Sequence, residues 1–179
     1  MKKLIALLLA AVMLMGVGAA CAETMIVEYD KGMDFTMDIP EQFEALTDVT
    51  DEGVLFVYMA GKDDNADVPS VLMLVAADDE HDETARLNDL TEDEKKAFAE
   101  SLFEDDDEKN YEIKTSGHGT EAVVIETMGE GYDSLEISSI YHGYVFHVYY
   151  GYADGRDLTD ADRELAMQLF TDLNVVIKE

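Results

Sequence analysis

Four histidines are the side chains of this sequence best suited to acid–base or metal chemistry near neutral pH. They are His81 in an acidic run, His118 between two glycines, His142 before a glycine and His147 inside an apolar run. No two of them have the spacing that places residues on one face of a helix or strand. The pattern favours three histidines in solvent and one packed histidine in a strand.

Motifs that carry catalysis are missing. The sequence has no Gly-x-Ser-x-Gly elbow, no His-Glu-x-x-His pair and no glycine-rich phosphate loop. A hydrolase that pairs His147 or His118 with an aspartate is the weakest function left open, because no nucleophile stands at a recognisable spacing. We therefore assign no catalytic and no cofactor-binding residue, and we expect no cofactor and no enzymatic activity.

One acidic segment imitates the start of a calcium loop. Its oxygen ligands stand at alternate positions, as Asp63, Asn65 and Asp67. Val68 occupies the position that needs glycine, and Leu74 stands where a bidentate Glu belongs. The run 105–108 offers low-affinity contacts to a divalent ion, although such runs are more typical of solvated loops. Low-affinity calcium binding is the second function left open, and no metal ligand is assigned.

The charge of the chain restricts its partners. The sequence has 41 Asp and Glu against 12 Lys and Arg, a formal net charge of -29. A polyanion of this kind repels nucleic acid and anionic lipid surfaces, whereas cationic partners suit it. A hydrophobic content of 47% is too high for a disordered chain. We expect a folded protein that does not bind nucleic acid.

Residues 1–22 have the three parts of a bacterial export signal: the basic start Met1–Lys3, the apolar run Leu4–Met15 and the A-x-A end Ala20-Cys21-Ala22. We expect cleavage after Ala22, a secreted or extracytoplasmic protein, and no membrane span in its mature form. Acylation of Cys21, giving a membrane-anchored lipoprotein, is the alternative. Gly18 makes a poor lipobox, because leucine is usual three residues before the cysteine.

Cys21 is the only cysteine, so the rest of the chain has no disulfide framework. The segment after residue 22 has no repeat, no linker and no break in composition, so residues 23–179 are expected to form a single domain.

Several segments are typical of strands. In Asp34–Ile39, apolar and polar residues alternate before Pro40, as in a half-buried strand. Three other segments are apolar at consecutive positions and predict strands covered on both faces. They are Val54–Met59, Val71–Ala77 and Ala122–Ile125.

His142-Gly143 suits a two-residue hairpin turn with positive φ, which pairs Leu135–Tyr141 with Tyr144–Tyr150. Five tyrosines gather around this hairpin: Tyr141, Tyr144, Tyr149, Tyr150 and Tyr152. They offer a floor for a ligand, although core packing accounts for most of such a cluster.

Two helices complete the prediction. Thr91 and Glu94 fit a capping box, and Phe98, Leu102 and Phe103 follow as an inward stripe. Thr159 repeats the start signal before a second stripe that ends near Asn174. An antiparallel sheet buried on both faces needs a helical layer on each side. The expected class is α+β, as an α/β/α sandwich with a central, mainly antiparallel sheet and helices on both faces.

The order of these elements resembles the PsbP-like fold, the PsbP/Mog-type domain also seen in small exported bacterial proteins and DcrB-like lipoproteins. The resemblance covers most of residues 25–179. It is carried by four segments: 35–40, 119–122, 143–146 and the last helix with its apolar tail 175–177. The resemblance implies a fold that hosts unrelated binding roles without a shared active site.

A non-enzymatic binding or accessory domain of the cell envelope or extracellular space is therefore the leading function. Its partner would be an envelope protein or a small ligand.

Overall fold

The structure is a computed structural model. It describes residues 21–30, 33–49, 53–77, 80–82, 84–103, 110–117, 119–129, 132–172 and 174–177. Most of the export signal, the acidic run 105–108 and His118 lie outside these residues.

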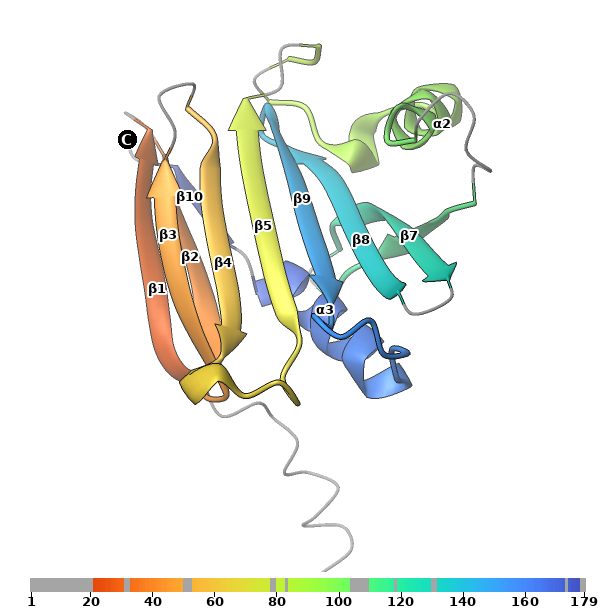
Figure 1. Cartoon of the computed structure of the whole chain (residues 1–179). Coiled ribbons are helices and arrows are strands. Elements are labelled where there is room, and N and C mark those ends of the chain that lie inside the picture. The colour runs from red at the N-terminus through yellow and green to blue at the C-terminus, as the bar shows by residue number, and fades with distance from the viewer. Residues whose placement is uncertain are drawn as a thin grey trace, which may run out of the picture.

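Ten strands form two antiparallel sheets in the described residues (Figure 1). The small sheet has the order β1-β2-β10, made of β1 (Cys21–Asp30), β2 (Met33–Pro40) and β10 (Asn174–Ile177). The large sheet has the order β3-β4-β5-β9-β8-β7-β6. Its strands are β3 (Phe43–Val49), β4 (Leu55–Gly61), β5 (Ser70–Ala77), β6 (Glu112–Thr115), β7 (Glu121–Gly129), β8 (Tyr132–Tyr141) and β9 (Tyr144–Gly151).

The strand predicted before Pro40 is β2. Phe35, Met37 and Ile39 are buried, whereas Asp38 is exposed. This alternation buries one side of the small sheet. The predicted apolar tail of the last helix is also a strand, because β10 pairs with the first half of β2.

The predicted hairpin of β8 and β9 is confirmed, with Tyr141 opposite Tyr144. His142 has φ 53° and Gly143 has φ 75°, the positive values that a type I′ turn requires. This turn sets the register of the two central strands, and it therefore decides which side chains share a face.

Both predicted helix starts are also present. Helix α2 (Glu92–Ser101) begins with the Thr91 capping box, in which Thr91 N donates to Glu94 Oε2 at 2.8 Å. Helix α3 (Asp160–Asp172) follows Thr159, whose hydroxyl accepts from Asp162 N at 3.3 Å and whose N–H donates to Asp162 Oδ2 at 2.8 Å. Each pair satisfies backbone groups that the first helical turn leaves unbonded.

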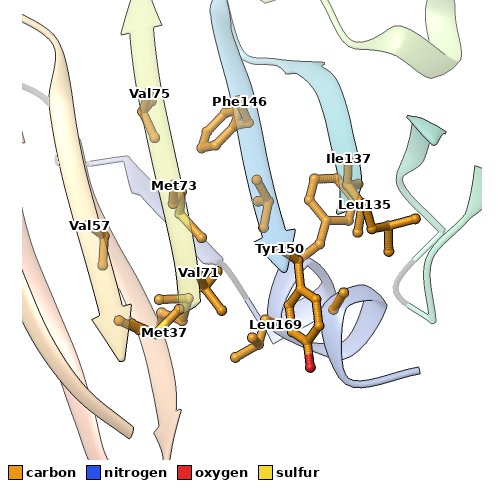
Figure 2. Packing of buried hydrophobic residues seen from close by; sticks show 14 of the residues in the cluster. Met37, Val57, Val71, Met73, Val75, Leu135, Ile137, Phe146, Tyr150 and Leu169 are labelled. Atoms are coloured by element: carbon orange, nitrogen blue, oxygen red, sulfur yellow. The ribbon is translucent and has the colours of Figure 1, made fainter. Parts of the chain in front are cut away.

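The main core, which we call the inner cluster, lies between one face of the large sheet and a layer made of β2 and α3. Val57, Met73, Val148 and Ile137 form one row of it across four strands. Figure 2 shows Tyr150 of β9 and Leu169 of α3 meeting at the helix contact. Burial of this apolar area is the main source of stability for the fold.

A second, smaller cluster, which we call the α2 cluster, lies on the opposite face of the large sheet. Leu87 and Ala99 are buried there against Val123, Ile125 and Ile140. Because Val123 and Ile125 of β7 alternate with Ala122 and Val124 of the inner cluster, β7 is buried on both faces, as predicted for Ala122–Ile125.

The side of the large sheet that carries the α2 cluster is called the outer face. Two rows of opposed residues cross it from β3 to β8. The first row is Leu46, Tyr58, Leu72, Tyr149 and Glu136, and the second is Asp48, Phe56, Leu74, His147 and Ser138.

Coverage of Val54–Met59 on both faces was a wrong prediction. Tyr58 is 42% exposed, and on the neighbouring β3 Leu46 is 71% exposed. The inner side of the large sheet packs against β2 as well as α3, so its cover is not purely helical. The large antiparallel sheet with two helices confirms the α+β class, whereas the α/β/α sandwich with a helical layer on each face is not confirmed. Consecutive apolar residues here build a core on one side and an apolar surface on the other.

Candidate functional site

A cleft of about 460 Å³ lies between α2 and the outer face. Phe98 and Ser101 of α2, with the C-cap residue Leu102, form one wall. The sheet forms the other wall with Glu136, Val145, His147 and Tyr149, and the segment after β5 adds Glu80 and His81. Among the described residues, the lining contains neither Lys nor Arg.

The cleft brings together two histidines that sequence spacing kept apart. His147 is carried by β9, and His81 lies beyond the end of β5, the strand that pairs with β9. The half-buried state of His147 agrees with a packed histidine, but the shared cleft was missed. Only the long-range pairing of β5 with β9 creates it, and short-range spacing carries no signal of such pairing.

Glu136 and His147, two residues of the sheet wall, are joined by the buried Ser138, and we call these three residues the floor of the cleft. Ser138 Oγ lies 2.8 Å from His147 Nδ1 and donates to Glu136 Oε1 at 3.0 Å, while His147 Nδ1 lies 3.4 Å from the same carboxylate oxygen. Ser138 is fully buried and directly opposite His147 in the β8–β9 ladder. A buried polar group of this kind is stable because its members satisfy one another.

This geometry does not make a serine nucleophile. In a catalytic triad the serine and the carboxylate bind opposite nitrogens of the histidine, so that one orients the ring and the other is activated. Here Ser138 and Glu136 both lie against Nδ1, and the Ser138 hydroxyl is covered. The arrangement holds the imidazole in place and presents it, with the carboxylate, to whatever enters the cleft.

The cleft has a negative electrostatic character. Glu136 lies beside Tyr149, whose pKa is raised by burial and then by the Glu136 carboxylate. The Tyr149 phenol therefore stays neutral at neutral pH. Tyr149 is 38% exposed and offers an aromatic face next to this charge. An aromatic surface beside a carboxylate suits a ligand with a cationic group and an apolar part.

The other tyrosines of the predicted cluster have structural roles for the most part. Tyr150 is buried, and its hydroxyl donates to Asp162 Oδ1 at 3.3 Å. Tyr152 donates to the same oxygen at 2.8 Å. Core packing thus explains much of the cluster, as predicted, and Tyr149 is the member that lines the cleft.

His142 differs from its prediction. It was expected in solvent, but it is half-buried, with its Nε2 3.0 Å from Arg86 Nη2 and its ring 4.4 Å from that of Tyr141. Burial and the nearby Arg86 guanidinium lower the pKa of His142. The residue fixes the hairpin turn to the segment that precedes α2.

The segment that imitates a calcium loop is held by an arginine. Arg156 Nη1 lies 3.1 Å from Asp67 Oδ1, and the same guanidinium lies over the Tyr152 ring. Asn65 Oδ1 accepts from the Asp67 N–H at 3.1 Å. Among the described residues, no group of three or more His, Cys, Asp or Glu side chains is arranged to hold a metal ion.

A second groove of about 580 Å³ lies between α3 and the end of β6. Its charged side chain, Lys114, is paired with Glu112 at 3.1 Å. The groove therefore lacks the group of converging titratable and aromatic side chains that makes the cleft the better candidate.

Comparison with known proteins supports the fold and nothing finer. No family model matches the sequence, and no curated protein matches it. The solution structure of cyanobacterial PsbP (CyanoP) from Synechocystis sp. PCC 6803 is similar, with a TM-score of 0.52 and 17% sequence identity, over 90% of this chain and 96% of that one. The fold is PsbP-like, as the resemblance implied. At this identity the likeness does not extend to function.

None of the helices in the described part of the chain is long and apolar enough to cross a membrane.

Proposed function

We propose that this protein is an exported, non-enzymatic binding or accessory domain of the cell envelope or extracellular space, and that it contacts its partner through the cleft and the adjoining outer face. The observation that carries the proposal is the exposure of Tyr58 and Tyr149 in one row that ends at Glu136 in the cleft. Exposed aromatic residues of this kind are typical of interaction surfaces.

Export is the second part of the proposal, and it is supported by residues 1–22. After cleavage behind Ala22, the mature chain keeps the β1–β2 ladder that begins with the pair Glu23 and Ile39. The ladder shifts register between Cys21 and Glu23, so the two β1 residues that cleavage removes, Cys21 and Ala22, precede its regular part. Lipid on Cys21 would place the same domain at a membrane surface. Mass spectrometry of the mature N-terminus distinguishes the two products.

Photo-crosslinking in the producing cells tests the proposed surface. A photoreactive phenylalanine analogue at Tyr58 reports on the outer face. The matched control is the same analogue at Met128 of β7, which is 73% exposed. By strand alternation Met128 lies on the side of the sheet opposite to the outer-face residues Val123 and Ile125. We expect a discrete adduct from position 58 and none from position 128. No adduct from position 58, or equal adducts from both, contradicts the proposal.

The other two functions have less support. Asp67, one of the calcium-loop residues, is already paired with Arg156, and Ser138 is buried against the histidine that it would need as a base. The cleft is therefore better suited to hold a ligand than to hydrolyse one.

A further inference from the structure

Within the described part of the chain, a helix covers only part of the width of the outer face. Helix α2 packs over β7 and β8 through the α2 cluster. Further along the sheet, Phe56, Leu72 and Leu74 belong to neither the inner cluster nor the α2 cluster. Together with the exposed Leu46 and Tyr58, they form an apolar band over β3, β4 and β5 that reaches Tyr149 on β9.

The size of this band corresponds to one helix. Neighbouring strands are spaced by about 4.8 Å, so the four strands β3, β4, β5 and β9 span about 14 Å. An α-helix with its side chains is about 10 Å wide. A helix placed beside α2 would therefore continue the outer layer over the uncovered strands, as helices do on the sheets of α+β proteins.

The charges around the band select the chemistry of its occupant. The five strands β3, β4, β5, β9 and β8 contain neither Lys nor Arg. Carboxylates stand at both ends of the band, with Glu44 and Asp48 on β3 and Glu136 at the cleft. An apolar band between two acidic margins is complementary to an apolar stripe between basic side chains.

The same charges disfavour two other occupants. A second copy of this chain would bring Glu44, Asp48 and Glu136 against the carboxylates of an identical acidic face in a symmetric contact, where like charges repel. An anionic lipid surface would be repelled by the margins and by the net charge of -29. Neither repulsion applies to a basic helix.

We infer that the outer face receives a basic amphipathic helix of a partner protein, which lies beside α2, packs its apolar stripe on Tyr58, Leu72 and Tyr149, and directs Lys or Arg side chains to Glu136 and to the β3 margin. This inference rests on the proposed function, because it names the partner of the same surface. The mode of contact is that of a helix laid in an apolar groove.

The test uses the mature chain and three synthetic peptides of about 18 residues, which is about five helical turns. The first peptide has Leu and Lys at helical spacing, the second has the same composition without an apolar stripe, and the third has Glu in place of Lys. Titration calorimetry measures their affinities. We expect the first peptide to bind at least about tenfold more tightly than the second, and the third not to bind.

Variants locate the binding site. Tyr58→Ser removes a central aromatic contact and should weaken the first peptide on the order of tenfold. Met128→Ser, on the opposite face, should not change the affinity. Glu136→Gln should weaken binding, whereas Glu164→Gln, an exposed carboxylate on α3, should have a smaller effect. Far-ultraviolet circular dichroism and melting temperature confirm that each variant is folded.

Equal binding of the first two peptides, or equal effects of Glu136→Gln and Glu164→Gln, would show general attraction to a polyanion and would overturn the inference. Sedimentation that shows a dimer dissociated by Tyr58→Ser would assign the face to a second copy instead. If any of these results is found while the photoreactive analogue at position 58 still gives an adduct in cells, the proposed function stands and only the inference of a helical partner is rejected. Absence of that adduct removes the proposed function itself.

Discussion

Ser138 Oγ lies 2.8 Å from His147 Nδ1, and the pair joins β8 to β9 at the floor of the cleft. Ser138 is fully buried, so the two groups depend on each other and on Glu136 for their hydrogen bonds. The Ser138–His147 contact therefore ties β8 to β9 by side chains in addition to the backbone ladder.

Ser138→Ala should lower the free energy of unfolding by about 1 kcal/mol, because a buried hydrogen bond is lost without creating a large cavity. Urea denaturation measures it. Ser70→Ala is the control, since Ser70 Oγ contacts Tyr58 at 3.3 Å in an exposed position, and it should cost much less. A silent Ser138→Ala would mean that the floor of the cleft is not held in this way.

Gly143→Val should destabilise the fold by about 1 to 3 kcal/mol, because a β-branched residue is strained at the φ of 75° observed for Gly143. Thermal and urea unfolding measure the effect. His142→Asn is the matched change in the same turn. Asparagine tolerates the φ of 53°, so the cost is limited to the contacts of the His142 ring with Arg86 and Tyr141, about 0.5 to 1 kcal/mol. A harmless Gly143→Val would remove this turn from the account of the register.

Asp162→Asn should lower stability by about 1 to 3 kcal/mol near neutral pH, because the Asp162 carboxylate accepts hydrogen bonds from Thr159, Tyr152 and Tyr150. Burial alone would raise the pKa of Asp162, but these hydrogen bonds outweigh it and hold the pKa below its ordinary value of 3.8.

The folded-state pKa of Asp162 is thus lower than the unfolded-state pKa. The stabilisation that the Asp162 carboxylate contributes is fully present above the unfolded-state pKa and is lost as the pH falls through the folded-state pKa. Urea unfolding from neutral to acidic pH should show the wild type and Asp162→Asn converging below pH 3.8. A constant difference across that range would contradict the assigned cause.

Salt should raise the melting temperature, because a chain with a net charge of -29 repels itself and ions screen the repulsion. At matched ionic strength, calcium, magnesium and sodium should act alike within the limits of ordinary screening. Stabilisation at micromolar calcium that magnesium does not reproduce, and that is lost when Asp63, Asn65 and Asp67 are replaced by serine, would instead reveal a coordinated calcium site.

Local chemistry predicted much of the fold. Thr91 with Glu94, Thr159 with Asp162, and His142 with Gly143 each contain their own capping or turn signal, so their elements could be identified without tertiary information. The class and the PsbP-like fold followed from the order of such elements.

The outer face was beyond the reach of the same reasoning. Tyr58 and Leu72 look like core residues in a consecutive apolar run, and only the absence of a covering layer among the described elements exposes Tyr58. His81 and Glu136 likewise share a cleft because distant strands pair. The candidate site depends on such long-range pairing, which the local pattern does not encode.

Nuclear magnetic resonance mapping of the mature chain during titration with the Leu–Lys helical peptide tests the central claim most directly. We expect shifts that centre on Leu46, Tyr58, Leu72 and Tyr149 and extend to Glu136, with little change at Met128 or in α3. Shifts that spread over acidic residues on all faces, or that centre on the groove between β6 and α3, would contradict the claim that the outer face is the binding surface.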